Sequence, residues 1–204
     1  MKKAILSLGL MAFAGSMITL QSCNKVKDAV LKNINPFDFS MQSFVVNVDP
    51  TPSGLDSLNT GAVSTKINLQ DSINKYVPSG LSLSLNDVKE VRLKTVTVSP
   101  ESGFTGGSTG NNFTNISDVA AMFNSNVGAS AGLQNIGQWL NIPQSSEREM
   151  QPIVFDYTSN PVNLKNYFST SGETEIRYFL RGKLRRAVTA PLQVRVTVQY
   201  TIVP

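Results

Sequence analysis

Side chains that commonly carry out acid–base, nucleophilic or metal chemistry are scarce in this sequence. The chain has no histidine, which excludes a Ser–His–Asp triad and histidine-ligated metal sites. Its glutamate pairs, Glu147 with Glu149 and Glu173 with Glu175, are each two residues apart. Catalytic carboxyl groups normally face each other across a cleft from different elements, so we interpret these pairs as surface charge. We therefore predict a protein that is not an enzyme and that holds no metal and no cofactor.

The single cysteine, Cys23, follows an uncharged segment near the start of the sequence. Two lysines in residues 1–3 precede the apolar residues 4–20, AILSLGLMAFAGSMITL. A short basic segment followed by an apolar run is typical of a secretory signal peptide. As a membrane-spanning helix the run is marginal, because a bilayer core needs about 20 apolar residues and glycine, serine and threonine interrupt this one.

The residues Leu20-Gln21-Ser22-Cys23 resemble the lipobox of a bacterial (Gram-negative) lipoprotein, although Gln21 departs from its commonest pattern. The resemblance implies that residues 1–22 are a signal peptide that is removed, and that the Cys23 thiol carries a diacylglycerol group. Durable anchoring needs two acyl chains, at about 0.8 kcal/mol for each buried methylene. A plain cleaved signal and a buried structural thiol are the alternatives for Cys23.

The resemblance places the protein on the outer membrane through a lipid anchor on Cys23. We expect the periplasmic face, because CNKVKDA lacks the acidic run that can direct lipoproteins to the cell surface, which stays open as a second location. Residues 23–36 are then a lipidated tether. Loss of Lys2 and Lys3 lowers the net charge from +4 to +2, so no nucleic-acid partner is expected.

Alternation of apolar and polar residues predicts strands through most of residues 37–204, which we expect to form a single domain. The predicted strands are 37–48, 62–70, 88–99, 153–157, 175–185 and 191–202, with 116–124 ambiguous between strand and helix. Changes of phase within 37–48 and 88–99 indicate β-bulges. Helical turns are expected at 71–77 and 163–168, and Leu133, Ile136 and Leu140 have helical spacing. The expected fold is an all-β antiparallel β-sandwich of immunoglobulin- or fibronectin-like architecture, with short helical turns in loops.

The last two predicted strands, 175–185 and 191–202, are expected to pair as a long antiparallel hairpin. Five basic residues of this hairpin form a predicted basic stripe that could bind an anionic ligand or lipid headgroups: Arg177, Arg181, Lys183, Arg185 and Arg195. The alternative, which we favour, is a solvated outer face whose charges prevent an edge strand from pairing with other chains.

Aromatic residues offer two further candidate sites. Phe104 and Phe113, in the Gly-rich loop 101–115, are candidate contacts of a loop-borne binding site, against the simpler interpretation of a mobile linker. Four others could stack on sugar rings, but are more typical of a core: Trp139, Tyr157, Tyr167 and Phe168.

The segment YFLRGKLRRAVTAPLQVRVTVQY loosely resembles the final hairpin of late-embryogenesis-abundant type 2 domains. The part after Cys23 is also similar to uncharacterised envelope lipoproteins of Gram-negative bacteria. Neither resemblance includes a specific motif, so neither assigns a functional residue. The sequence predicts a lipid-anchored, non-enzymatic cell-envelope protein that binds or supports another envelope component, either a protein or a glycan. The alternative is a carbohydrate-binding accessory lipoprotein of a glycan-uptake system.

Overall fold

The computed structural model describes residues 29, 33–41, 43–51, 57–77, 83–127 and 132–204. Cys23 and most of the predicted tether lie outside the described residues. The chain divides into two compact units, residues 1–36 with Pro204 and residues Phe37–Val203. The fold described below is that of the second unit. None of the described helices is long and apolar enough to cross a membrane.

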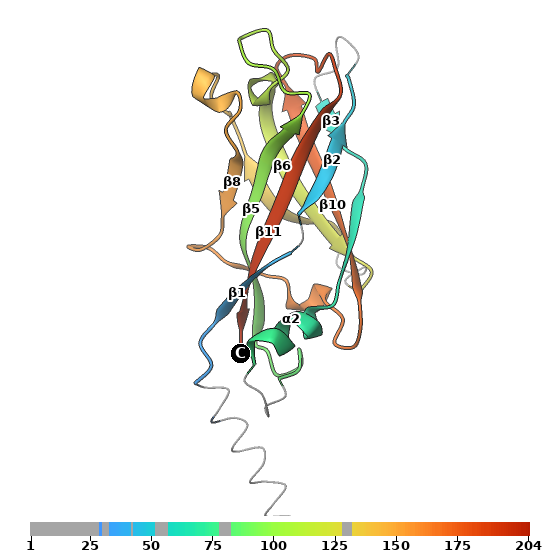
Figure 1. The fold of residues 1–204 in the computed structure, drawn as a ribbon, viewed down its shortest axis with the longest axis vertical. Coiled ribbons are helices and arrows are strands. Elements are labelled where there is room, and N and C mark those ends of the chain that lie inside the picture. Colours follow the sequence, from blue (N-terminus) through green and yellow to red (C-terminus); the bar gives the residue numbers. More distant parts are fainter. Residues whose placement is uncertain (1–28, 30–32, 42, 52–56, 78–82, 128–131) are drawn as a thin grey trace, which may run out of the picture. The chain divides into compact units, whose positions relative to one another are not determined.

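Two antiparallel sheets pack face to face in this unit (Figure 1). The first sheet has the order β1-β11-β5-β8, with β2 also on β11 and β9 also on β5. Its strands are β1 (Phe37–Ser40), β2 (Phe44–Val48), β5 (Glu90–Ser102), β8 (Ile153–Asp156), β9 (Val162–Asn163) and β11 (Leu192–Val203). The second sheet has the order β3-β10-β6-β7, with β4 also on β10. Its strands are β3 (Ser57–Asn59), β4 (Val63–Ile67), β6 (Ile116–Ser125), β7 (Gln134–Trp139) and β10 (Thr174–Leu184).

The helical segments are short and lie between strands. They are α2 (Leu69–Tyr76) and the 3-10 turns η1 (Phe113–Asn115), η3 (Ser146–Arg148) and η4 (Lys165–Tyr167). The predicted all-β antiparallel sandwich with short helical turns in its loops is therefore confirmed.

The core lies between the sheets, where alternate side chains of each strand point inward. On β11 these are Val194, Val196, Val198, Tyr200 and Ile202, all buried. They face inward-pointing residues of β10, and the hydroxyls of Tyr178 and Tyr200 meet across the core at 3.1 Å. Full burial of such an apolar side chain contributes about 1.5–3 kcal/mol.

The predicted hairpin between 175–185 and 191–202 is wrong. β10 pairs with β3, β4 and β6, whereas β11 pairs with β1, β2 and β5. Residues 185–191 carry the chain from the second sheet to the first. Each strand has one apolar face, and such faces can be buried side by side or opposite each other, so alternation alone does not choose the partner.

Both predicted β-bulges are present. Phe37 to Ser40 pair with Ile202 to Gln199, but Phe44 pairs with Val196, so three residues of this segment oppose two of β11. On β5, Leu93 pairs with Tyr200 and Thr95 with Gln199, which leaves Lys94 as the extra residue. A single extra residue moves the following side chains to the other face, as the changed phase of the sequence indicated.

Some of the expected elements differ in the structure. The strand predicted over 62–70 ends at Ile67, because the Asn68 side chain accepts a hydrogen bond from the Asp71 N–H and caps α2. The helical spacing of Leu133, Ile136 and Leu140 was misleading, because 134–139 form strand β7 and only Ile136 is buried. The ambiguous segment 116–124 is a strand, β6, and its inward residues include Phe123.

Candidate functional site

The predicted basic stripe does not form one surface. Arg195 lies on β11, and therefore on the outer face of the first sheet, where its guanidinium pairs with both carboxylate oxygens of Glu101. Arg177, Arg181 and Lys183 lie on the outer face of the second sheet, on the opposite side of the sandwich. Because the hairpin does not exist, Arg195 is separated from the others.

The remaining four residues have different surroundings. Arg177 Nε pairs with Glu175 Oε1 at 3.2 Å. Arg185 lies just beyond the end of β10 and donates to backbone carbonyls of neighbouring loops. Of the five, only Arg181 and Lys183 line a common pocket. The stripe thus reduces to a pair of cations on the second sheet.

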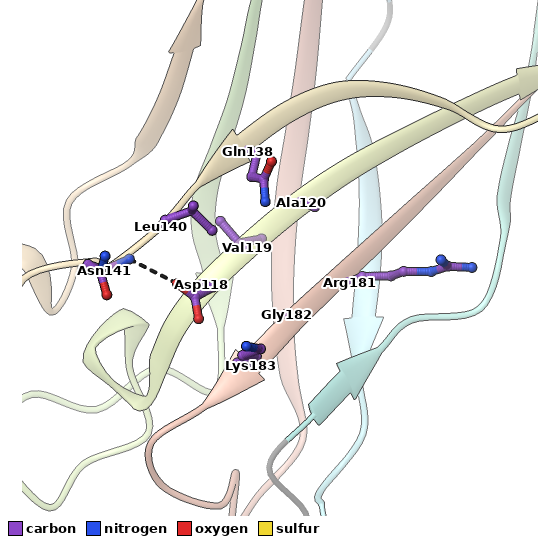
Figure 2. Close-up of a pocket in the computed structure, with 9 residues that line it drawn as sticks. All are labelled: Asp118, Val119, Ala120, Gln138, Leu140, Asn141, Arg181, Gly182 and Lys183. Carbon is purple, nitrogen blue, oxygen red and sulfur yellow. Dashed lines mark hydrogen bonds between the residues drawn. The ribbon is translucent and has the colours of Figure 1, made fainter.

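We call this pocket the outer-face groove (Figure 2). It has a volume of about 460 Å³ and is lined by residues of β6, β10, β7 and the segment after β7: Asp118, Val119, Ala120, Gln138, Leu140, Asn141, Arg181, Gly182 and Lys183. In the strand register, Ala120 lies opposite Arg181 on one side and opposite Gln138 on the other. A small residue between two long ones leaves a hollow, with Ala120 as its floor.

Asp118 and Asn141 close one end of the groove. The Asn141 backbone N–H donates to Asp118 Oδ1 at 2.9 Å, as the dashed line in Figure 2 shows. This hydrogen bond, one from Ser117, and the charges of Lys183 and Arg185 hold the pKa of Asp118 below its usual value. Asp118 is therefore ionised at neutral pH, beside the Lys183 that lies opposite it in the register.

The groove combines groups suited to binding a polar ligand. Its lining offers cations, the Asp118 carboxylate and the side-chain amides of Gln138 and Asn141, and Leu140, which is 55% exposed, adds an apolar wall. Asp118 is its only carboxylate, so the lining has no pair of carboxyl groups for acid–base work. The described residues also contain no group of three or more side chains that could hold a metal ion.

Sequence reasoning found Arg181 and Lys183 but missed Gln138, Leu140 and Asn141. These three lie in or next to the segment where Leu133, Ile136 and Leu140 have helical spacing, and no strand was expected there. β6 and β7 change register between Ala121 and Met122, so β7 has an extra residue that disturbs its alternation. For this reason the outward-facing residues Asn135 and Gln138 are three positions apart, whereas a regular strand would place them two or four apart. The sequence alone does not show this spacing, because it depends on the pairing of β7 with β6.

The loop 103–112 forms a folded structure that includes one of the two candidate phenylalanines. Phe113 is 2% exposed, so it packs beneath the loop and offers no surface to a ligand. Phe104 is half-buried and contacts the Phe113 ring edge-on at 4.9 Å. The Asn112 side chain donates to the carbonyls of Thr105 and Gly107, which holds the loop together.

A second pocket, which we call the loop-end pocket, lies where this loop, η3 and the β10–β11 connection meet. Its volume is about 390 Å³, and each residue that lines it has a polar side chain: Ser108, Thr114, Gln144, Ser145, Ser146, Glu149, Arg185 and Arg186. Figure 1 shows the three segments gathered at the upper end of the sandwich.

Two of the four candidate aromatics line a third pocket, the aromatic hollow, between β7 and β8. It has a volume of about 340 Å³, and Trp139 and Tyr157 lie on its wall. The Arg148 guanidinium lies 5.3 Å from the centre of the Trp139 ring, and Tyr157 donates to the Ile136 carbonyl. Tyr167 and Phe168 are buried in the core.

Comparisons with known proteins identify no family. No family model matches the chain, and no curated protein matches it. Matches among solved structures include tomato aspermy virus (11% identity, 80% of this chain and 78% of that chain, TM-score 0.30). They also include the decameric BFDV capsid protein (8% identity, 82% of this chain and 99% of that chain, TM-score 0.32). Similarity at this level carries no argument about function.

Proposed function

We propose that this chain is a lipid-anchored, non-enzymatic cell-envelope protein that binds another envelope component through the outer-face groove. The observation that carries the proposal is the row Arg181–Ala120–Gln138, in which one small residue leaves a hollow between long polar side chains. The lipobox-like residues 20–23 support the anchor and the outer-membrane location.

Binding accounts for the groove better than catalysis does. The lining has cations and amides, but it has no histidine or cysteine, and its single carboxylate is ionised. A group that accepts and donates protons near neutral pH is therefore absent from the lining. Such a surface can hold a polar partner by hydrogen bonds and charge, and the wall at Leu140 adds apolar contact.

A carbohydrate-binding accessory lipoprotein of a glycan-uptake system is the second candidate. The aromatic hollow favours it, because Trp139 and Tyr157 lie together on the wall of a partly exposed pocket. Tyrosine and tryptophan each combine an apolar ring with a polar group. They are therefore suited to a sugar, which has an apolar ring face and polar hydroxyl groups. Loss of binding to a neutral oligosaccharide in Trp139→Ala, with Ala120→Leu unaffected, would favour this candidate over the first.

Photocrosslinking in intact cells tests the groove. A photoreactive residue at the exposed position 140 is expected to form an adduct with an envelope component. Ala120→Leu fills the groove floor on an outer face and should reduce that adduct at least tenfold, because the hollow no longer admits the partner. Thr197→Leu adds comparable bulk to the outer side of β11, on the other sheet, and should leave the adduct unchanged. Equal adducts in Ala120→Leu and the unaltered chain would rule out the groove as the binding surface.

A further inference from the structure

Two adjacent arginines at the end of β10 are held in place by uncharged acceptors. Arg185 Nη1 donates to the Ile116 carbonyl at 2.9 Å, and its Nη2 donates to the Ile142 carbonyl. Arg186 Nη2 donates to the Gly110 carbonyl at 2.8 Å and to the Asn115 side chain. Within the part of the chain that the structure describes, neither arginine forms an ion pair with a carboxylate.

Hydrogen bonds to uncharged acceptors therefore hold both guanidinium groups in position without a direct carboxylate partner. A guanidinium has five N–H donors, and these hydrogen bonds leave donors on both arginines without an acceptor among the described residues. Side chains that are ordered before a ligand arrives lose less entropy when they bind it. Arginine also suits phosphate, because its planar fork can donate two parallel hydrogen bonds to it.

Both arginines line the loop-end pocket, together with several hydroxyl groups. The hydroxyls of Ser108, Ser145 and Ser146 form no hydrogen bond to another described residue. Thr114 differs, because its hydroxyl donates to Asn112 Oδ1 at 2.6 Å. The pocket thus brings fixed cations and unused hydroxyl donors together in a volume of about 390 Å³.

We propose that the loop-end pocket binds a tetrahedral oxyanion, namely a phosphate or sulfate group that is free or carried by a larger ligand. A tetrahedral oxyanion presents three or four acceptor oxygens in different directions, which matches donors that come from three separate segments. A carboxylate has only two oxygens in one plane and would leave donors unused. No residue lines both this pocket and the outer-face groove, and the proposed oxyanion site requires neither the lipid anchor nor binding in that groove.

Glu149 is the one acidic residue in the pocket lining, and it weakens the positive field. Its Oε2 accepts a hydrogen bond from the Gly107 N–H at 2.7 Å, which ties the carboxylate to the loop. Glu149→Gln keeps an acceptor oxygen for Gly107 while removing the negative charge. We expect this variant to bind the oxyanion several-fold more tightly than the unaltered chain does.

A titration of the full-length ¹⁵N-labelled chain, followed through its arginine side-chain NMR signals, tests the site. At constant ionic strength in chloride, inorganic phosphate and sulfate should shift the Arg185 and Arg186 signals to saturation. Acetate, a planar carboxylate, should shift them much less at the same concentration. Arg186→Gln should weaken phosphate binding at least tenfold, and Arg181→Gln, in the outer-face groove, should have no effect.

Arg186 also supports the loop, so loss of binding in its variant could reflect misfolding. Ser145→Ala combined with Ser146→Ala removes two donors without touching either arginine, and should weaken phosphate binding about three- to tenfold. Unchanged phosphate binding in the double serine variant, or shifts by acetate as large as those by phosphate, would overturn the proposal. Tighter binding of glycerol 1-phosphate than of inorganic phosphate would indicate a phosphate ester as the ligand, and equal binding would indicate the free ion.

Discussion

Tyr178 and Tyr200 place two hydroxyl groups in the apolar core between the sheets. The two oxygens are 3.1 Å apart, and the Tyr178 hydroxyl donates to Met41 Sδ at the same distance. Tyr200 must then donate to Tyr178. Burial raises the pKa of both phenols well above the usual value, because a phenolate would lose its hydration there.

The pH dependence of stability follows from these two phenols. Above about pH 10 the unfolded chain releases phenolic protons that the folded chain retains, so the free energy of unfolding should fall as pH rises. Two such groups together lower it by at most about 2.7 kcal/mol per pH unit. Urea unfolding between pH 8 and pH 11 measures the slope. Combining Tyr178→Phe with Tyr200→Phe should flatten it, and Met41→Leu, which keeps both phenols, should not. The same slope in the double variant and the unaltered chain would contradict this assignment.

At the scale of strands and loops, Gly103 joins the end of β5 to the loop 103–112. It has φ of +76°, and a Cβ atom there would lie 2.1 Å from the Pro191 carbonyl oxygen. Gly107 also has a positive φ, +88°, but a Cβ atom at this position would meet nothing within 4 Å. The two glycines therefore separate the cost of backbone conformation from the cost of a steric clash.

Alanine substitutions at these glycines should differ in cost. Gly107→Ala should lower the free energy of unfolding by about 1 kcal/mol, which is the cost of a left-handed backbone at alanine. Gly103→Ala adds a clash with backbone that has to move, and should cost about 2–4 kcal/mol. Chemical denaturation of both variants provides the measurement. An equal loss in the two variants would mean that β5 and the β10–β11 connection do not approach each other as closely as described.

Local features of the elements were predictable from sequence, whereas their partners were not. The bulges in 37–48 and at Lys94 change the phase of the apolar–polar alternation, so they could be predicted from the sequence. The pairing partner of β10 could not be predicted in this way. Alternation shows which face of a strand is apolar, but it does not show which strand lies beside it. The outer-face groove needs Ala120 between Arg181 and Gln138, a row that exists only through the register of three strands.

For the molecule as a whole, the proposed link between the Phe37–Val203 unit and the envelope rests on residues 20–36. Thirteen residues lie between Cys23 and Phe37, and the fourteen steps from one Cα atom to the next can span at most about 50 Å when the chain is fully extended. The unit has its own core, formed by both sheets, and that core does not depend on the anchor for its packing. Attachment and folding should therefore be separable by mutation.

Cys23→Ala is expected to move the protein from the membrane fraction to the soluble fraction, because the proposed attachment is through acyl chains on this residue. Its thermal unfolding midpoint should match that of the purified, lipidated chain, since the core lies wholly within Phe37–Val203. Combining Lys25→Ala with Lys27→Ala tests the alternative that attraction of basic residues to headgroups holds the protein. Under the proposed lipid anchor this variant should stay in the membrane fraction. Cell fractionation followed by immunoblotting distinguishes the variants. Retention of Cys23→Ala in the membrane, or release of the lysine variant, would show that the acyl chains are not what holds the protein there.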